Sequence, residues 1–150
     1  MNPSILVVDD DQEFLHLMHA ILQRLDVRVE YAASGREALA KIAVGDFDVI
    51  LLDLVMPDID GLEVIRRMSA SRPSLVARTI MVTAACSDSL RELDSRPVYA
   101  VMRKPFDLDQ LVHMIGSCAG ERPGHERGLA GPFHIVSHLH ALALPKPVFR

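Results

Sequence analysis

The sequence predicts an α/β fold in which a doubly wound, five-stranded parallel sheet is covered by helices on both faces. Short runs rich in β-branched residues alternate with stretches of helical periodicity, which is typical of parallel strands joined by crossover helices. Acidic side chains end the first and third of these runs, where open α/β sheets carry their chemistry. A strand order of 2-1-3-4-5 fits the length, because right-handed crossovers leave few arrangements open.

The predicted strands are short apolar segments rich in valine, isoleucine or threonine. They are Ile5–Val8, Val27–Tyr31, Val49–Leu52, Thr79–Val82 and Val98–Met102.

The predicted helices show apolar residues at helical spacing. The second has the clearest boundaries, because Ser34 and Glu37 form a capping-box pattern and Gly45 lies where a C-terminal glycine belongs. The helices are expected from about Gln12 to Leu25, from Ser34 to Gly45, from about Gly61 to Ala70, over a short weak segment at Ser87–Leu93, and onward from about Asp107.

The chain changes character at Gly116, after which glycines and prolines punctuate a loop-like segment. We therefore expect one domain over residues 1–120 and a tail over residues 121–150, in which one further short helix fits. The tail carries an apolar, histidine-rich piece at 133–142. Docking of this piece on the domain or on a second subunit is favoured over metal binding by His134 and His138, because no acid or cysteine lies close by.

Composition narrows the class of protein. Apolar residues make up 49% of the 150 residues, which suits a globular domain, and the net charge of −4 argues against non-specific nucleic-acid binding. No apolar run approaches the length of a membrane span, and no basic region precedes the first apolar run. We expect a cytoplasmic protein in which Cys86 and Cys118 are free thiols.

Carboxylates from two predicted strands are expected to meet at one edge of the sheet. Asp9 and Asp10 follow the first strand, and Asp53 follows the third. Three converging acids repel one another unless a cation compensates them, so the cluster indicates a site for Mg²⁺ and a phosphoryl group. Thr83 and Lys104 follow the fourth and fifth strands, and their hydroxyl and ammonium groups can hold the oxygens of a phosphoryl group on Asp53.

These motifs together resemble the receiver domain of two-component response regulators, which has a flavodoxin-like fold. The resemblance covers about residues 4–118, and the strand order given above rests in part on it. The motifs are Val7-Val8-Asp9-Asp10, Leu52-Asp53 with Met56-Pro57 and Asp60-Gly61, Val82-Thr83-Ala84, and Lys104-Pro105-Phe106.

The resemblance implies a role for each residue of the site. Asp53 would accept the phosphoryl group, Thr83 would hydrogen-bond one of its oxygens, and Lys104 would pair with Asp53 before transfer and with the phosphoryl group afterwards. The expected Mg²⁺ ligands are Asp9 (directly or through water), Asp10, Asp53 and the backbone carbonyl of Val55.

The resemblance also implies a signalling domain rather than an enzyme, and the lack of a basic recognition helix in the tail leads us to expect a stand-alone domain. It would receive its phosphoryl group from a sensor histidine kinase or a histidine phosphotransfer protein. It would then signal by phosphorylation-dependent protein binding or by phosphorelay to an unknown downstream protein, without contacting nucleic acid or membrane. A homodimer is expected through the tail or through the face that combines the fourth helix, fifth strand and fifth helix.

Two alternatives stay open, namely a phosphorylation-independent scaffold and, less favoured, a phosphatase that forms an aspartyl-phosphate intermediate. Such phosphatases commonly carry a general acid two residues after the nucleophile, where this chain has Val55. Neither Val55 nor Ala85 can position a water by hydrogen bonding, so we expect slow self-dephosphorylation.

One position departs from the family pattern. The aromatic switch residue usually lies three positions before the lysine, where this chain has Val101. Tyr99 lies two positions earlier with the same strand parity, so output is expected to differ from the common aromatic mechanism.

Overall fold

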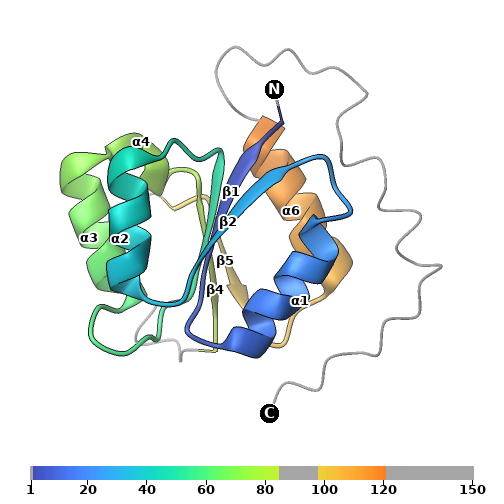
Figure 1. Cartoon of the computed structure of the whole chain (residues 1–150), viewed down its shortest axis with the longest axis horizontal. Coiled ribbons are helices and arrows are strands. Elements are labelled where there is room, and N and C mark those ends of the chain that lie inside the picture. The colour runs from blue at the N-terminus through green and yellow to red at the C-terminus, as the bar shows by residue number, and fades with distance from the viewer. Residues whose placement is uncertain (1, 85–97, 121–150) are drawn as a thin grey trace.

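The computed structural model describes residues 2–84 and 98–120, and it contains an all-parallel sheet between two layers of helices (Figure 1). The strand order is β2-β1-β3-β4-β5, so the predicted fold class and order are confirmed. The ends of the strands lie within two residues of their predicted positions. The strands are β1 (Ser4–Val8), β2 (Arg28–Ala32), β3 (Val49–Leu52), β4 (Thr79–Thr83) and β5 (Ala100–Arg103).

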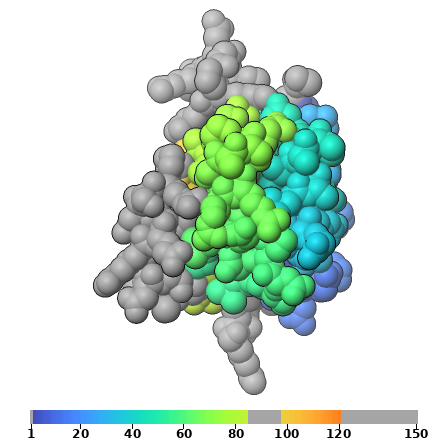
Figure 2. Space-filling model, turned by 90° about the vertical axis from the view of Figure 1, so that its left-hand side faces the viewer, coloured from blue at the N-terminus to red at the C-terminus, as the bar shows by residue number. Residues whose placement is uncertain are grey.

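Two hydrophobic cores lie on opposite faces of the sheet because successive side chains of a strand alternate between its faces. In β1, Ile5 and Val7 join the core under α1 (Gln12–Leu22) and α6 (Leu108–Gly120). Leu6 and Val8 join the core on the other face. That face is covered by α2 (Gly35–Val44), α3 (Gly61–Ser71) and α4 (Pro73–Val76), which lie side by side in Figure 2.

Four of the described helices begin at polar side chains that satisfy their first backbone amides. Asp11 accepts hydrogen bonds at the start of α1, Ser34 at the start of α2, Asp60 at the start of α3 and Asp107 at the start of α6. The cap at Ser34 agrees with the sequence prediction. Helix α1 ends at Leu22, three residues earlier than expected, because the chain turns there and the Leu25 amide donates to the Leu22 carbonyl. Among the described residues, no helix has the length and apolar character to cross a bilayer.

Two features of the helices differ from the sequence prediction. Helix α4 was not predicted; its proline stands in the first turn, where no amide is needed, and both Leu75 and Val76 are buried. Gly116 was expected to begin a loop, and that prediction was wrong. Helix α6 continues to Gly120 because Cys118 extends its buried stripe by another turn. The predicted helix Ser87–Leu93 and the tail 121–150 lie outside the described residues.

Glycine allows the loop after β3 to pack closely against a helix. A Cβ atom on Gly61, the first residue of α3, would lie 2.3 Å from the carbonyl oxygen of Asp53. The Gly61 amide donates to the Leu54 carbonyl at 2.8 Å, which fastens α3 directly to the carboxyl end of β3. The backbone around Asp53 is therefore held by the start of α3.

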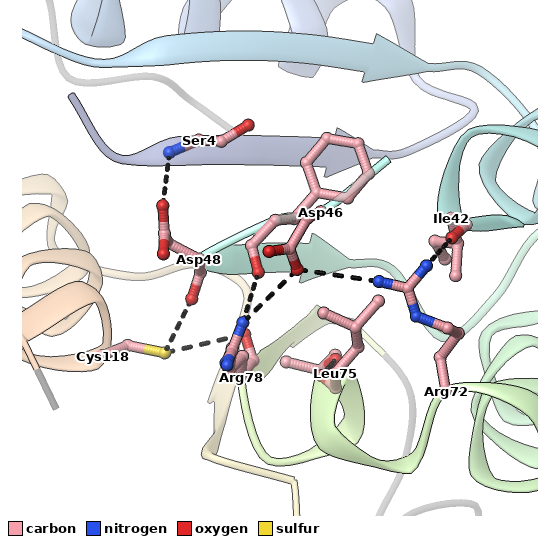
Figure 3. Close-up of polar contacts among 10 residues, drawn as sticks. Ser4, Ile42, Asp46, Asp48, Arg72, Leu75, Arg78 and Cys118 are labelled. Carbon is pink, nitrogen blue, oxygen red and sulfur yellow. Dashed lines mark hydrogen bonds and ion pairs between the residues drawn. The ribbon is translucent and has the colours of Figure 1, made fainter. Parts of the chain in front are cut away.

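The amino ends of the strands are tied together on the edge away from these carboxyl ends (Figure 3). The Asp48 carboxylate accepts a hydrogen bond from the Ser4 amide at 2.9 Å, which joins β1 to β3. Arg78 precedes β4, donates to the Phe47 carbonyl at 3.1 Å and lies 3.7 Å from the Asp46 carboxylate.

We predict that Asp48→Ala lowers the free energy of unfolding by about 1–3 kcal/mol, because it leaves the buried Ser4 amide without this acceptor. Asp46→Ala is the matched control and should cost less than about 1 kcal/mol, because Asp46 is exposed and its ion pairs with Arg72 and Arg78 are long, at 3.6 and 3.7 Å. Urea denaturation measures both. Equal losses in the two variants would contradict this assignment.

Candidate functional site

Three carboxylates meet at the carboxyl ends of β1 and β3, at the lower edge of the sheet in Figure 1. Val8 pairs with Leu52 in the sheet, so the next residues, Asp9 and Asp53, are neighbours. Oxygen atoms of Asp9, Asp10 and Asp53 lie within 4.8 Å of one another. Asp9 and Asp53 are buried, whereas Asp10 is exposed. The structure thus brings together the acids singled out in the sequence.

Lys104 reaches this cluster from the segment after β5. Its Nζ atom donates to Oδ2 of Asp9 at 2.7 Å and lies 4.0 Å from Oδ2 of Asp53. Its shorter contact is with Asp9, and the ion pair with Asp53 that the resemblance implies is present at 4.0 Å. The peptide bond between Lys104 and Pro105 is cis.

Thr83 and Val55 flank the cluster in different ways. Thr83 is the last residue of β4 and fully buried, and its carbonyl accepts a hydrogen bond from the Lys104 amide at 2.9 Å. Val55 is 62% exposed, and its backbone amide donates a hydrogen bond to the Asp53 carboxylate. Ala85, the other residue expected beside the path of an attacking water, lies outside the described residues.

The two buried carboxylates, Asp9 and Asp53, have too little positive charge nearby to offset the effect of their burial. Burial is the largest effect on Asp53 and, with the negative charge of Asp9, raises its pKa to about 6. The Lys104 ammonium and the backbone of Val55 and Leu54 oppose this rise without cancelling it. The pKa of Asp9 is also raised, again mainly by burial, although Lys104 hydrogen-bonds to it. The acidic cluster therefore favours added positive charge.

The donor set fits Mg²⁺, which prefers carboxylate, carbonyl and water oxygens. Asp9, Asp10 and Asp53 supply carboxylate oxygens within one small volume, and the Val55 carbonyl stands two residues after Asp53. A bound cation would also favour the ionised forms of the two buried acids.

One contact at the site was not anticipated. The ring of Phe14, on α1, lies beneath Lys104, with Nζ 4.5 Å from the ring centroid. In the sequence, Phe14 belongs to the apolar stripe of the first helix and looks like any other core residue. Its relation to Lys104 depends on how α1 packs near the segment that follows β5, and no local pattern in the sequence reports that packing.

Comparison with known proteins agrees with this geometry. The family model of the response regulator receiver domain matches residues 5–116, and the chain belongs to this family. Receiver domains take up a phosphoryl group in two-component signalling, interact with histidine kinases or phosphotransfer proteins, and bind Mg²⁺ through acidic residues.

Two relatives from Mycobacterium tuberculosis are transcriptional regulatory proteins. TcrA is 34% identical over 107 residues, which are 71% of this chain and 42% of TcrA. TrcR is 37% identical over 110 residues, which are 72% of this chain and 42% of TrcR. The chain thus spans about two fifths of the length of these relatives.

Two solved structures are also similar. A CheY-like receiver domain protein from Methanospirillum hungatei has a TM-score of 0.74 and 31% identity, over 81% of this chain and 96% of that one. The response regulator TrrA from Thermotoga maritima, in complex with Mg²⁺ and BeF, has a TM-score of 0.68 and 31% identity, over 79% of this chain and 99% of that one.

We predict that Asp53→Asn stabilises the metal-free protein at neutral pH. Folding raises the Asp53 pKa from 3.8 to about 6, so its contribution to stability is fully present below pH 3.8 and is lost as the pH rises through about 6. Above pH 6 the variant should gain at most about 3 kcal/mol, since a tenfold change in acidity corresponds to about 1.4 kcal/mol.

Denaturant unfolding in EDTA, repeated between pH 4 and pH 8, measures this difference. The exposed Asp46→Asn serves as control and should show no such trend with pH. A gap between wild type and Asp53→Asn that stays constant over the whole range would contradict the prediction.

Proposed function

We propose that this chain accepts a phosphoryl group on Asp53 from a histidine kinase or a histidine phosphotransfer protein. We further propose that it signals by phosphorylation-dependent protein binding or by passing the group onward. The observation that carries the proposal is the position of Asp53, buried within 4.8 Å of two further carboxylates and reached by Lys104. Membership of the receiver family supports it.

In the transfer step, a carboxylate oxygen of Asp53 forms a bond to phosphorus while the nitrogen–phosphorus bond of the donor phosphohistidine breaks. The electron pair of that bond returns to the imidazole nitrogen. Lys104 and Thr83 would hold oxygens of the phosphoryl group, through an ammonium and a hydroxyl. Mg²⁺ held by Asp9, Asp10, Asp53 and the Val55 carbonyl would neutralise charge on the phosphoryl oxygens.

The residues around Asp53 support storage of the phosphoryl group rather than repeated turnover. The side chain of Val55 can neither protonate a leaving group nor orient a water. We therefore propose a signalling domain and not a phosphatase. The acidic edge favours a protein partner over nucleic acid. The homodimer contact stays a prediction, because the tail and residues 85–97 lie outside the described residues.

Incubation with acetyl phosphate and Mg²⁺ tests the acceptor. We expect the intact mass of the wild type to rise by one phosphoryl group, and Asp53→Asn to gain none. Asp46→Asn, which lies at the opposite edge of the sheet, should be modified like the wild type. A wild type that gains no phosphoryl group would contradict the proposal, and steady phosphate release from unrelated phosphoesters would favour the phosphatase instead.

The lifetime of the phosphorylated protein tests the role of Val55. We expect a half-life well beyond minutes in Mg²⁺ buffer, because the exposed valine offers no hydrogen bond to an attacking water. Val55→Gln places an amide at this position and should shorten the half-life several-fold. Loss of phosphate from the wild type within seconds would refute this prediction.

A further inference from the structure

We propose that Phe14 is a positioning residue for phosphoryl transfer, because its ring holds the Lys104 ammonium within reach of both Asp9 and Asp53. This inference rests on the proposed function of Asp53 as acceptor. It assigns a task to a side chain that otherwise belongs to the core under α1 and α6.

The position of the Lys104 ammonium requires an explanation, because a lysine side chain is long and flexible. Its head group lies 2.7 Å from Asp9, 4.0 Å from Asp53 and 4.5 Å from the centroid of the Phe14 ring. The lysine side chain is only 13% exposed, so solvent weakens these attractions little. The face of an aromatic ring carries partial negative charge and attracts an ammonium at this distance.

The ring of Phe14 is itself fixed in place. The side chain is 2% exposed, and the ring of Phe106 meets it edge to face, with centroids 6.1 Å apart and an interplanar angle of 82°. Phe106 follows Lys104 by two residues, so the ring that packs against Phe14 belongs to the same segment of chain as the lysine.

Helix α1 also links the ring to the acidic cluster. Asp11 begins the helix by accepting hydrogen bonds from the amides of Glu13 and Phe14. The Asp11 amide in turn donates to the Asp9 carboxylate at 2.9 Å. The segment from Asp9 to Phe14 therefore sets the distance between the Asp9 carboxylate and the Phe14 ring, both of which contact the Lys104 ammonium.

A core role alone would make the ring replaceable by another apolar side chain of similar burial, whereas a positioning role depends on Lys104. Phe14→Leu keeps the site apolar and removes the ring. Phe47→Leu is the matched control, because Phe47 is also fully buried but lies in the core on the opposite face of the sheet. Lys104→Met removes the charge that the ring attracts.

The experiment measures the rate of phosphorylation by acetyl phosphate with saturating Mg²⁺, following intact mass, for each variant that unfolds cooperatively. We expect Phe14→Leu to lower the rate roughly tenfold and Phe47→Leu to leave it within twofold of the wild type. In the Lys104→Met background, Phe14→Leu should have no further effect. Equal effects of the two leucine variants, or an undiminished effect of Phe14→Leu without the lysine, would overturn the inference.

A second readout does not depend on phosphorylation. The ring current of Phe14 should move the side-chain methylene resonances of Lys104 upfield in NMR spectra of ¹³C-lysine-labelled protein, and Phe14→Tyr should keep that shift. Methylene resonances at the position of a solvated lysine in the wild type would overturn the inference by themselves. A wild type that shows the ring-current shift but gains no phosphoryl group would refute the proposed function, and with it the role of Phe14 in transfer, while leaving the contact between the ring and Lys104 established.

Discussion

Two buried carboxylates, Asp9 and Asp53, lie beside the Lys104 ammonium, which contacts the first at 2.7 Å and the second at 4.0 Å. Burial nevertheless raises the pKa of both acids, so one nearby ammonium does not balance them. Phosphorylation would replace the single charge of Asp53 by nearly two, which increases the imbalance. A site built in this way needs additional positive charge to hold a phosphoryl group. Nearby groups that are free to move will shift in response to the new negative charge.

The acidic cluster lies at the carboxyl edge of the sheet, whereas hydrogen bonds that hold the strands in register lie at the amino edge. At the amino edge, Asp48 and Arg78 connect the starts of β1, β3 and β4 through hydrogen bonds to backbone groups. At the carboxyl edge, Gly61 at the start of α3 packs closely against the Asp53 backbone and fixes the position of that residue. The hydrogen bonds at the amino edge therefore hold the strands together against the repulsion among the carboxylates at the carboxyl edge.

The sequence predicts this fold well where a single pattern determines the outcome. Strands β1 and β3 are buried on both faces, so they appear as short, mostly apolar runs, and acids that follow these adjacent parallel strands must meet. Prediction fails where packing between distant segments decides. Helix α4 is a single turn, too short to show a period, and α6 passes through Gly116 because Cys118 is buried against the Arg78 carbonyl. The contact between the Phe14 ring and Lys104 was not predicted for the same reason, since the two residues are ninety positions apart in the sequence.

The contact between β4 and β5 suggests how a change at the site reaches the sheet edge without an aromatic residue at position 101. The Lys104 amide donates to the Thr83 carbonyl at 2.9 Å, so two groups proposed to hold the phosphoryl oxygens are joined through the backbone. A shift of Thr83 toward the phosphoryl group would therefore pull on the segment after β5 itself. Val101 is 41% exposed in β5, and Tyr99 already packs partly against the core under α1 and α6. We therefore propose that phosphorylation of this chain displaces β5 and its flanking residues rather than burying a ring at position 101.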